Sequence, residues 1–347
     1  MIDFLLILFI SALGTYYVMP HSIRKLKENN LVVRDMYKHE KNKVATNAGI
    51  IVLFISFISI SLFPLVIRFF SFLFDFDFAY SDLNDVNLSI LLVISIYAIY
   101  GLVDDLVDLG HKLKFLLPIT FSFPLISVVN PEYLPVPFYG NFDLNNHFLA
   151  DIEYGDILRI IIIPLYVMVV ANLVNMHSGY NGLQSGLSLI LLITLFFKSW
   201  LDGTIYKILP LASFLGSISI FWIYNKFPSK VFEGNVGSQL FGSLIGCIIV
   251  VQEYWWFGFF ILIPHTINFI LWIVWLIKIK QYPKIYLNSN GTHRKFGKVN
   301  KRGIISVPNR LTLKWVPNFY YRLNEMQSVN IMYLLTFLFC LIAIIIL

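Results

Sequence analysis

Long apolar stretches separated by short polar segments cover most of the 347-residue chain. A helix needs about 20 apolar residues to cross the hydrocarbon core of a bilayer. The stretches that reach or approach this length lie at residues 2–20, 48–74, 88–103, 114–130, 157–175, 186–201, 208–224, 237–252, 254–279 and 328–347. The pattern predicts an all-α, integral multi-pass membrane protein of about ten transmembrane helices. We expect a single integral membrane domain over residues 1–347, with a long loop at 280–327 before the last helix.

Composition agrees with a membrane protein. Hydrophobic residues make up 58% of the chain and charged residues only 13%, whereas a soluble domain carries about 25% charged residues. The two cysteines, Cys247 and Cys340, both fall inside apolar stretches. They therefore indicate neither a disulfide framework nor a cysteine metal site.

The placement of basic residues predicts the orientation in the membrane. Basic residues follow the first stretch at Arg24, Lys25 and Lys27 and do not precede it, which is not the charge order of a cleaved signal peptide. With the N-terminus outside, the inner loops would be 21–47, 104–113, 176–185, 225–236 and 280–327, and these loops with their flanks hold 22 of the 26 Lys and Arg residues. By the positive-inside rule, both termini are expected on the outer side. The net charge of +6 then reflects topology and contact with anionic lipid or phosphate, and we expect no nucleic acid partner.

Three carboxylates lie together where the third apolar stretch ends, on the predicted cytoplasmic side. On a helix, Asp104 and Asp108 share a face, and Asp105 points about 100° away from them. Acids at the end of a membrane helix are costly to desolvate, and a divalent cation or a cationic partner would relieve their mutual repulsion. A solvated acidic helix end is the other interpretation of the same pattern.

Two further inner segments carry polar residues with metal-binding or packing potential. Asn172 and Asn175 share a helical face ahead of a turn rich in Gly and Asn, where amide oxygens could bind Mg²⁺ or the turn could simply cap a helix. Residues 231–237 read Val-Phe-Glu-Gly-Asn-Val-Gly, and small residues follow at helical spacing, which indicates close helix packing.

The loop 280–327 has no obvious hydrophobic core of its own. Its basic run, Thr292 to Lys298, suits phosphate oxygens, although attraction to the membrane surface would explain it equally well.

In this order, the segments resemble the polyprenyl-phosphate N-acetylhexosamine-1-phosphate transferases of the glycosyltransferase family 4 type, and most of all the eukaryotic and archaeal UDP-GlcNAc–dolichyl-phosphate enzymes. Asp35 to Lys38 with Gly49 is similar to the family's first motif, and Asp104 to Pro118 to its second. Asn172 to Leu183 is similar to the central motif, and Val231 to Asn235 to the family's Val-Phe-x-Gly-Asp. The basic segment 292–300 resembles the eukaryotic-type sugar-recognition loop and lacks the His-His-His cluster of the bacterial phospho-MurNAc-pentapeptide transferases.

The resemblance implies transfer of GlcNAc-1-phosphate from UDP-GlcNAc to a dolichyl or other polyprenyl phosphate. UMP would be released, as the first membrane step of N-glycan-type glycan assembly. Mg²⁺ would be the cofactor, with Mn²⁺ as the alternative. The candidate residues at the positions of the family's motifs are Asp104, Asp105 and Lys114 for catalysis; Asp108, Asn172, Asn181, Phe232, His293, Arg294 and Lys295 for substrate binding; and Asn175, Asn235 and Glu233 for the metal. Among these, Asn181 and Phe232 would frame the uridine, and His293 and Arg294 would reach the sugar.

The chain departs from the family pattern at Asn235, where an aspartate that binds magnesium is expected. A neutral ligand lowers Mg²⁺ affinity, so either Glu233 supplies the missing carboxylate or the chain is a weakened, non-catalytic paralogue or transporter. Thr46 and Gln184 also stand where related proteins often carry an acid. A transferase that uses undecaprenyl phosphate or another UDP-HexNAc is the second alternative.

The cellular setting follows from the source of the chain. We expect the cell membrane of a prokaryote, with an archaeon favoured, or the endoplasmic reticulum membrane if the source is eukaryotic. A homodimer is left open.

Overall fold

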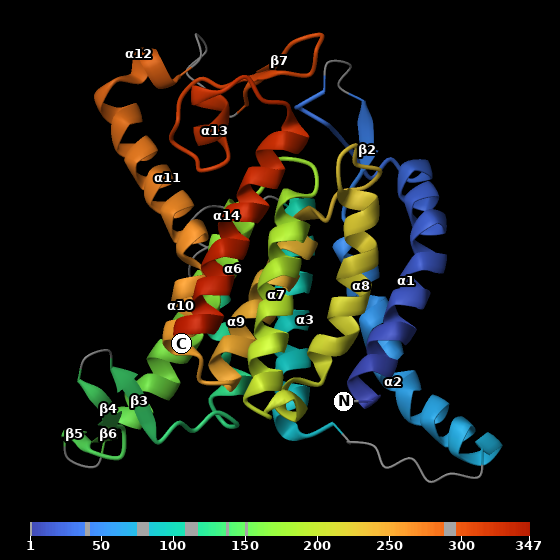
Figure 1. Ribbon diagram of the computed structural model, residues 1–347, viewed down its shortest axis with the longest axis vertical. Coiled ribbons are helices and arrows are strands. Elements are labelled where there is room, and N and C mark those ends of the chain that lie inside the picture. Colours follow the sequence, from blue (N-terminus) through green and yellow to red (C-terminus); the bar gives the residue numbers. More distant parts are fainter. Residues whose placement is uncertain are drawn as a thin grey trace.

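The computed structural model describes residues 2–38, 42–74, 83–107, 117–136, 139–149, 152–287 and 296–347. It is a bundle of long, roughly aligned helices (Figure 1). Within the described residues, eight helical segments are long and apolar enough to cross a membrane. They are α1 (Ile2–Glu28), α2 (Gly49–Phe74), α3 (Asp85–Val107), the continuous run α5–η2–α6 (Tyr154–Met176), α7 (Leu183–Leu201), α9 (Gly234–Val251), α11 (Ile263–Gln281) and α14 (Glu325–Ile346). The predicted all-α, multi-pass membrane architecture is confirmed.

The remaining predicted spans differ in detail. The stretch 208–224 forms α8 (Pro210–Asn225), a helix of 16 residues that packs beside α1 and α2. The stretch 254–279 divides into α10 (Trp255–Ile261) and α11, because Pro264 follows the break at Leu262 and cannot continue the preceding hydrogen-bond ladder. The stretch 114–130 lies partly outside the described residues, and its described part includes the short 3₁₀ turn η1 (Phe123–Leu125).

Among the described residues, four small antiparallel hairpins join the helices, and the hydrophobic pattern did not predict them. They pair β1 (Val32–Arg34) with β2 (Lys43–Ala45), β3 (Tyr133–Val136) with β4 (Gly140–Asp143), β5 (His147–Leu149) with β6 (Ile152–Glu153), and β7 (Lys298–Val299) with β8 (Ile305–Ser306). Strands of two to four residues are too short to produce a readable alternation. Two further short helices, α12 (Pro283–Tyr286) and α13 (Trp315–Tyr320), lie in the segment that follows α11.

The buried helix α9 forms the centre of the bundle. Every residue from Val236 to Val251 is buried, as expected for a helix that is apolar on all sides. The predicted close packing of small residues is confirmed, because a Cβ added to Gly242 would lie 2.7 Å from the Cα of Ala171 on α6. On the other side, a Cβ on Gly101 of α3 would lie 2.4 Å from the carbonyl oxygen of Asn235. These contacts bring the ends of α3 and α6 to the start of α9.

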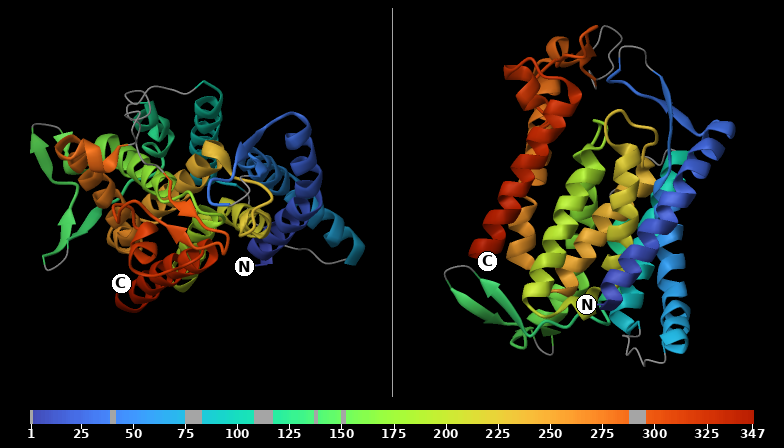
Figure 2. Two further views of the ribbon diagram at one scale, coloured as in Figure 1. Left: turned by 90° about the horizontal axis from the view of Figure 1, so that it is seen from above. Right: turned by 45° about the vertical axis from the view of Figure 1, so that its right-hand side comes forward.

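The polar connections are divided between the two ends of the bundle. The β1–β2 and β7–β8 hairpins and α13 lie at one end, while the β3–β6 hairpins lie at the other, toward which both termini point (Figure 2). The orientation of these ends in a membrane stays a prediction.

A second, smaller hydrophobic cluster lies at the end of the bundle that contains α13. Its buried members are Tyr37, Tyr180, Leu183, Leu187, Ile305, Leu313, Trp315, Val329 and Met332. The described part of the loop 280–327 therefore has a core, which it shares with the first loop, the turn after α6 and the start of α14. No single stretch of sequence reveals such a core, because each segment supplies only a few of its side chains.

Candidate active site

A cavity of about 330 Å³ lies at this end of the bundle, where five separate segments meet. Its walls come from the first loop, the end of α3, the turn between α6 and α7, the start of α9, and Phe296 just before β7. The sequence-predicted residues that line it are Asp105, Asn175, Asn181, Phe232, Glu233 and Asn235. Asp105 and Asn235, which are 130 positions apart in the chain, are thus brought to one site.

The predicted acidic motif contacts the start of α9 directly. The backbone N–H of Asn235 donates a hydrogen bond to Asp105 Oδ2 at 2.8 Å, and Asn235 Nδ2 donates to Asp104 Oδ2 at 3.1 Å. Gly234 makes this approach possible, since its φ is +71° and a Cβ there would lie 2.9 Å from Asp105 Oδ2. Asp104 and Asp105 are therefore both held by one residue, Asn235.

Glu233 occupies a less polar part of the same wall. The segment before it is fixed to the first loop by a parallel bridge between Ala45 and Val231. Asn225 Nδ2 donates to Glu233 Oε2 at 2.9 Å. Desolvation outweighs this hydrogen bond and raises the pKa of Glu233 to about 7. A bound cation would shift this carboxyl toward its ionised form.

The two asparagines of the central motif take different positions. Asn175 lines the cavity, whereas the Asn172 amide nitrogen donates to the carbonyl oxygen of Met168 one helical turn earlier, at 2.9 Å. The structure therefore places Asn175 at the site, and Asn172 is not among the residues that line the cavity. Asp108, Lys114, His293, Arg294 and Lys295 lie outside the described residues.

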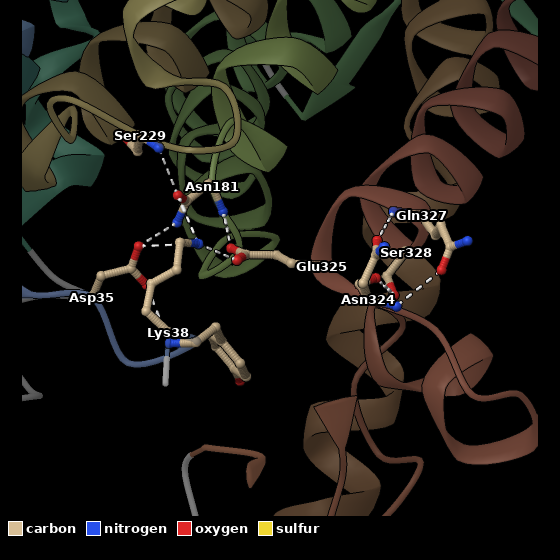
Figure 3. A network of polar contacts seen from close by, with 9 residues as sticks. Asp35, Lys38, Asn181, Ser229, Asn324, Glu325, Gln327 and Ser328 are labelled. Atoms are coloured by element: carbon tan, nitrogen blue, oxygen red, sulfur yellow. Dashed lines mark hydrogen bonds and ion pairs between the residues drawn. The ribbon is translucent and has the colours of Figure 1, made fainter. Parts of the chain in front are cut away.

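Asn181 is buried and held by the protein on several sides (Figure 3). Its amide oxygen accepts from Lys38 Nζ at 3.2 Å and from the backbone N–H of Ser229 at 2.8 Å. Its amide nitrogen donates to Asp35 Oδ2 at 3.1 Å, and its backbone N–H donates to Glu325 Oε1 at 2.6 Å. The predicted nucleotide-binding residue is thus also the centre of a polar network that joins three loops.

Sequence analysis did not identify Glu325. An acidic residue after Asn324 at the start of an apolar run is typical of a helix cap, and Asn324 and Gln327 do form a capping box there. A first-turn carboxylate that favours the helix dipole is normally solvated, so the sequence gives no signal that Glu325 is only 2% exposed.

The neutral residues at positions 46 and 184 have local explanations. Gln184 Nε2 donates to the carbonyl oxygen of Val174 at 3.1 Å, and its Oε1 accepts from Ser238 Oγ at 2.9 Å. A glutamate at this position would place an acceptor against the Val174 carbonyl. Thr46 Oγ1 donates to Asn47 Oδ1 at 3.3 Å at the edge of the cavity.

The donor set of the cavity fits a hard divalent cation such as Mg²⁺. Carboxylate and amide oxygens come from Asp105, Glu233, Asn175 and Asn235, and Mg²⁺ in enzymes typically takes one or two carboxylates together with substrate phosphates and waters. Within the described ranges, no group of three or more His, Cys, Asp or Glu side chains is close enough to hold a metal unaided. The four cavity residues would hold such an ion together with phosphate oxygens of a substrate.

Known proteins match the chain over the same elements. The family model for glycosyl transferase family 4 matches residues 87–253, from the start of α3 to just beyond the end of α9. A protein of Saccharolobus solfataricus, provisionally named UDP-N-acetylglucosamine–dolichyl-phosphate N-acetylglucosaminephosphotransferase, is 30% identical over 99% of this chain and 96% of its own length. The Saccharomyces cerevisiae protein of that name is 23% identical over 66% of this chain and 52% of its own. The phospho-N-acetylmuramoyl-pentapeptide-transferase of Streptococcus uberis is 27% identical over 71% and 72%.

A membrane-spanning helical bundle with carboxylates and amides around a cavity at one end, together with these relatives, defines an integral membrane phosphoglycosyl transferase. Its similarity to the Saccharolobus solfataricus protein extends over nearly the whole of both chains. The chain belongs to glycosyl transferase family 4.

Proposed function

We propose that this enzyme transfers GlcNAc-1-phosphate from UDP-GlcNAc to dolichyl phosphate or a similar polyprenyl phosphate, releases UMP, and thereby performs the first membrane step of N-glycan-type glycan assembly. The observation that carries the proposal is the pairing of Asp104 and Asp105 with Asn235 beside a cavity at the end of the helix bundle. A site at a bundle end can receive a lipid phosphate from the bilayer and a nucleotide sugar from water. The names of the Saccharolobus and Saccharomyces relatives support the choice of donor and acceptor.

In the proposed reaction, an oxygen of the lipid phosphate attacks the phosphorus atom that carries GlcNAc. The bond from that phosphorus to the oxygen bridging to the uridine-linked phosphate breaks, and this oxygen leaves on UMP. Because both reactants are anions that need in-line alignment, positioning and charge neutralisation matter more than a strong base. Asp105 and Asp104 would orient the lipid phosphate or seat the metal, and Lys114 would hold phosphate oxygens.

We propose Mg²⁺ as the cofactor, held by Asn175, Asn235, Asp105 and Glu233 with the diphosphate oxygens. A bound Mg²⁺ would neutralise charge on the diphosphate and stabilise the leaving phosphate. Phe232 and Asn181, which line the same cavity, would frame the uridine. We further propose that His293, Arg294 and Lys295 reach the sugar and its phosphate, and that the enzyme works in the cell membrane of a prokaryote.

The test of donor and acceptor is a transfer assay with purified enzyme in detergent or nanodiscs. UDP-GlcNAc, UDP-GalNAc and UDP-MurNAc-pentapeptide are each paired with dolichyl and undecaprenyl phosphate, and the lipid product is identified by mass. The proposal predicts that UDP-GlcNAc with dolichyl phosphate gives the highest kcat/KM. Preference for UDP-MurNAc-pentapeptide, or nucleotide binding without transfer to any acceptor, would contradict it.

A further inference from the structure

The turn between α6 and α7 forms one wall of the cavity and is contacted by several other parts of the chain. Residues Ser178 to Asn181 line the cavity, only a few positions after Asn175. Gly179 has a φ of +100°, so the turn follows a path that other residues rarely adopt. A segment with few contacts opens easily, so contacts from outside the turn stabilise this conformation.

Asp35, Lys38 and Ser229 bond to the side chain of Asn181. The C-terminal part of the chain contacts the backbone of the turn and the side chain of Tyr180. At the end of the turn, Glu325 Oε1 accepts the backbone N–H of Asn181 at 2.6 Å. At its beginning, Lys314 Nζ donates to the carbonyl oxygen of Ser178 at 2.5 Å. Between them, the Tyr180 hydroxyl donates to Asn318 Oδ1 at 2.9 Å.

Two of these contacts involve charged side chains, of which Glu325 is buried and Lys314 is half-buried. Glu325 is 2% exposed, and its second oxygen accepts from Lys38 Nζ at 2.6 Å (Figure 3). Lys314 Nζ lies 5.3 Å from the ring centre of Tyr180 and 5.9 Å from that of Tyr37. Hydrogen bonds to shielded charges are stronger than those between neutral groups, and removing one partner leaves the other without compensation.

We propose that Glu325 and Lys314 are positioning residues for the nucleotide sugar, because they hold the two ends of the 178–181 turn in the shape that binds the uridine diphosphate moiety. Neither side chain is among those that line the cavity, so each acts through the turn. The choice of a uridine nucleotide as ligand rests on the proposed function. The segment 314–325 thereby becomes part of the donor site and not only a connection to the last helix.

The contacts define what each substitution removes. Glu325→Gln keeps an oxygen that can accept from Asn181, but it turns an amide N–H toward the ammonium of Lys38 and removes the ion pair. Glu325→Ala removes both contacts. Lys314→Met keeps most of the apolar stem and removes only the hydrogen bond to Ser178 and the charge.

Gln327 provides a matched control. Its side chain accepts from the backbone N–H of Asn324 at 3.0 Å and completes the capping box of α14. Within the part of the chain that the structure describes, Gln327 makes no hydrogen bond to the 178–181 turn. Gln327→Ala therefore weakens the start of the same helix without changing the contacts of the 178–181 turn. A loss shared by Glu325→Ala and Gln327→Ala would come from the helix, and a loss confined to Glu325→Ala would come from the turn.

The experiment measures equilibrium binding of UDP-GlcNAc and UMP to the full chain in nanodiscs by calorimetry, with a thermal unfolding curve for each variant. We expect Glu325→Ala and Lys314→Met to weaken binding of both nucleotides by about tenfold or more, equivalent to about 1.4 kcal/mol or more, and Gln327→Ala to bind like the wild type. In transfer assays, KM for the nucleotide sugar should rise, while KM for the lipid acceptor stays the same. Glu325→Gln should fall between Glu325→Ala and the wild type.

Wild-type affinity in both Glu325→Ala and Lys314→Met would overturn the proposal, as would an equal loss in Gln327→Ala. The binding readout separates this proposal from the function it rests on. If the wild type binds UDP-GlcNAc but transfers nothing, the proposed function fails, and the binding of the variants still decides the role of Glu325 and Lys314.

Discussion

Replacing Asn235 by aspartate tests why this chain departs from its family at a metal-binding position. The Asn235 amide nitrogen donates to Asp104 Oδ2 at 3.1 Å. Asn235→Asp removes this hydrogen bond and places a second carboxylate oxygen at about the same distance from Asp104 Oδ2. At this distance the repulsion is about 1 to 5 kcal/mol, taking an effective dielectric constant between that of water and about 20. Without divalent metal, the variant should therefore be less stable than the wild type.

A cation between the two carboxylates would reverse the effect. Because an added ligand charge raises affinity for a hard divalent cation, the Mg²⁺ concentration for half-maximal activity should fall about tenfold or more in Asn235→Asp. The assay is UMP release at varied Mg²⁺, alongside thermal unfolding of the purified variant with and without Mg²⁺. Asn235→Ala is the control that removes the hydrogen bond without adding charge. An unchanged or higher Mg²⁺ requirement in Asn235→Asp would refute the assignment of Asn235 to the metal site.

Three further predictions test the surrounding structure. Gly234→Ala should cost about 1–3 kcal/mol in unfolding free energy and most of the activity, because the φ of +71° and the close approach of Asp105 exclude a side chain. Gln184→Glu should lower the free energy of unfolding by about 1–3 kcal/mol, measured by thermal unfolding, because an acceptor would then face the Val174 carbonyl. The pKa of Glu233 is raised to about 7 from a usual 4.5, so the contribution of Glu233 to stability without metal is fully present below pH 4.5 and is lost as pH rises through 7. Unfolding curves of Glu233→Gln across this range should lack that decline; an identical slope in variant and wild type would contradict it.

The sequence predicted the membrane bundle well, because the hydrophobic signal of long helices is strong. Spans such as α2 and α9 were apparent as continuous apolar runs. The division of residues 254–279 into α10 and α11 was missed, since the apolar run continues through the break at Leu262. The hairpin β1–β2 was missed because three-residue strands carry no alternation.

The sequence predicted the site residues that belong to local motifs. It did not predict those that reach the site only through contacts between distant segments. The resemblance gave Asp105, Asn175 and Asn235, which the structure brings to one cavity. The roles of Glu325 and Lys314 depend on contacts across 144 and 136 positions of sequence, and no local pattern contains that information. The role suggested for Asn172 by its motif position stays a prediction, and its amide nitrogen bonds to its own helix.

Identification of both products of one turnover tests the central claim most directly. Purified enzyme, UDP-GlcNAc, dolichyl phosphate and Mg²⁺ are incubated together, and the released nucleotide and the lipid are identified by mass. The account predicts UMP and a GlcNAc-diphosphate lipid in equal amounts, no reaction when Mg²⁺ is chelated, and loss of both products in Asp105→Asn. Release of UDP with a GlcNAc-monophosphate lipid, or full activity without divalent metal, would contradict it.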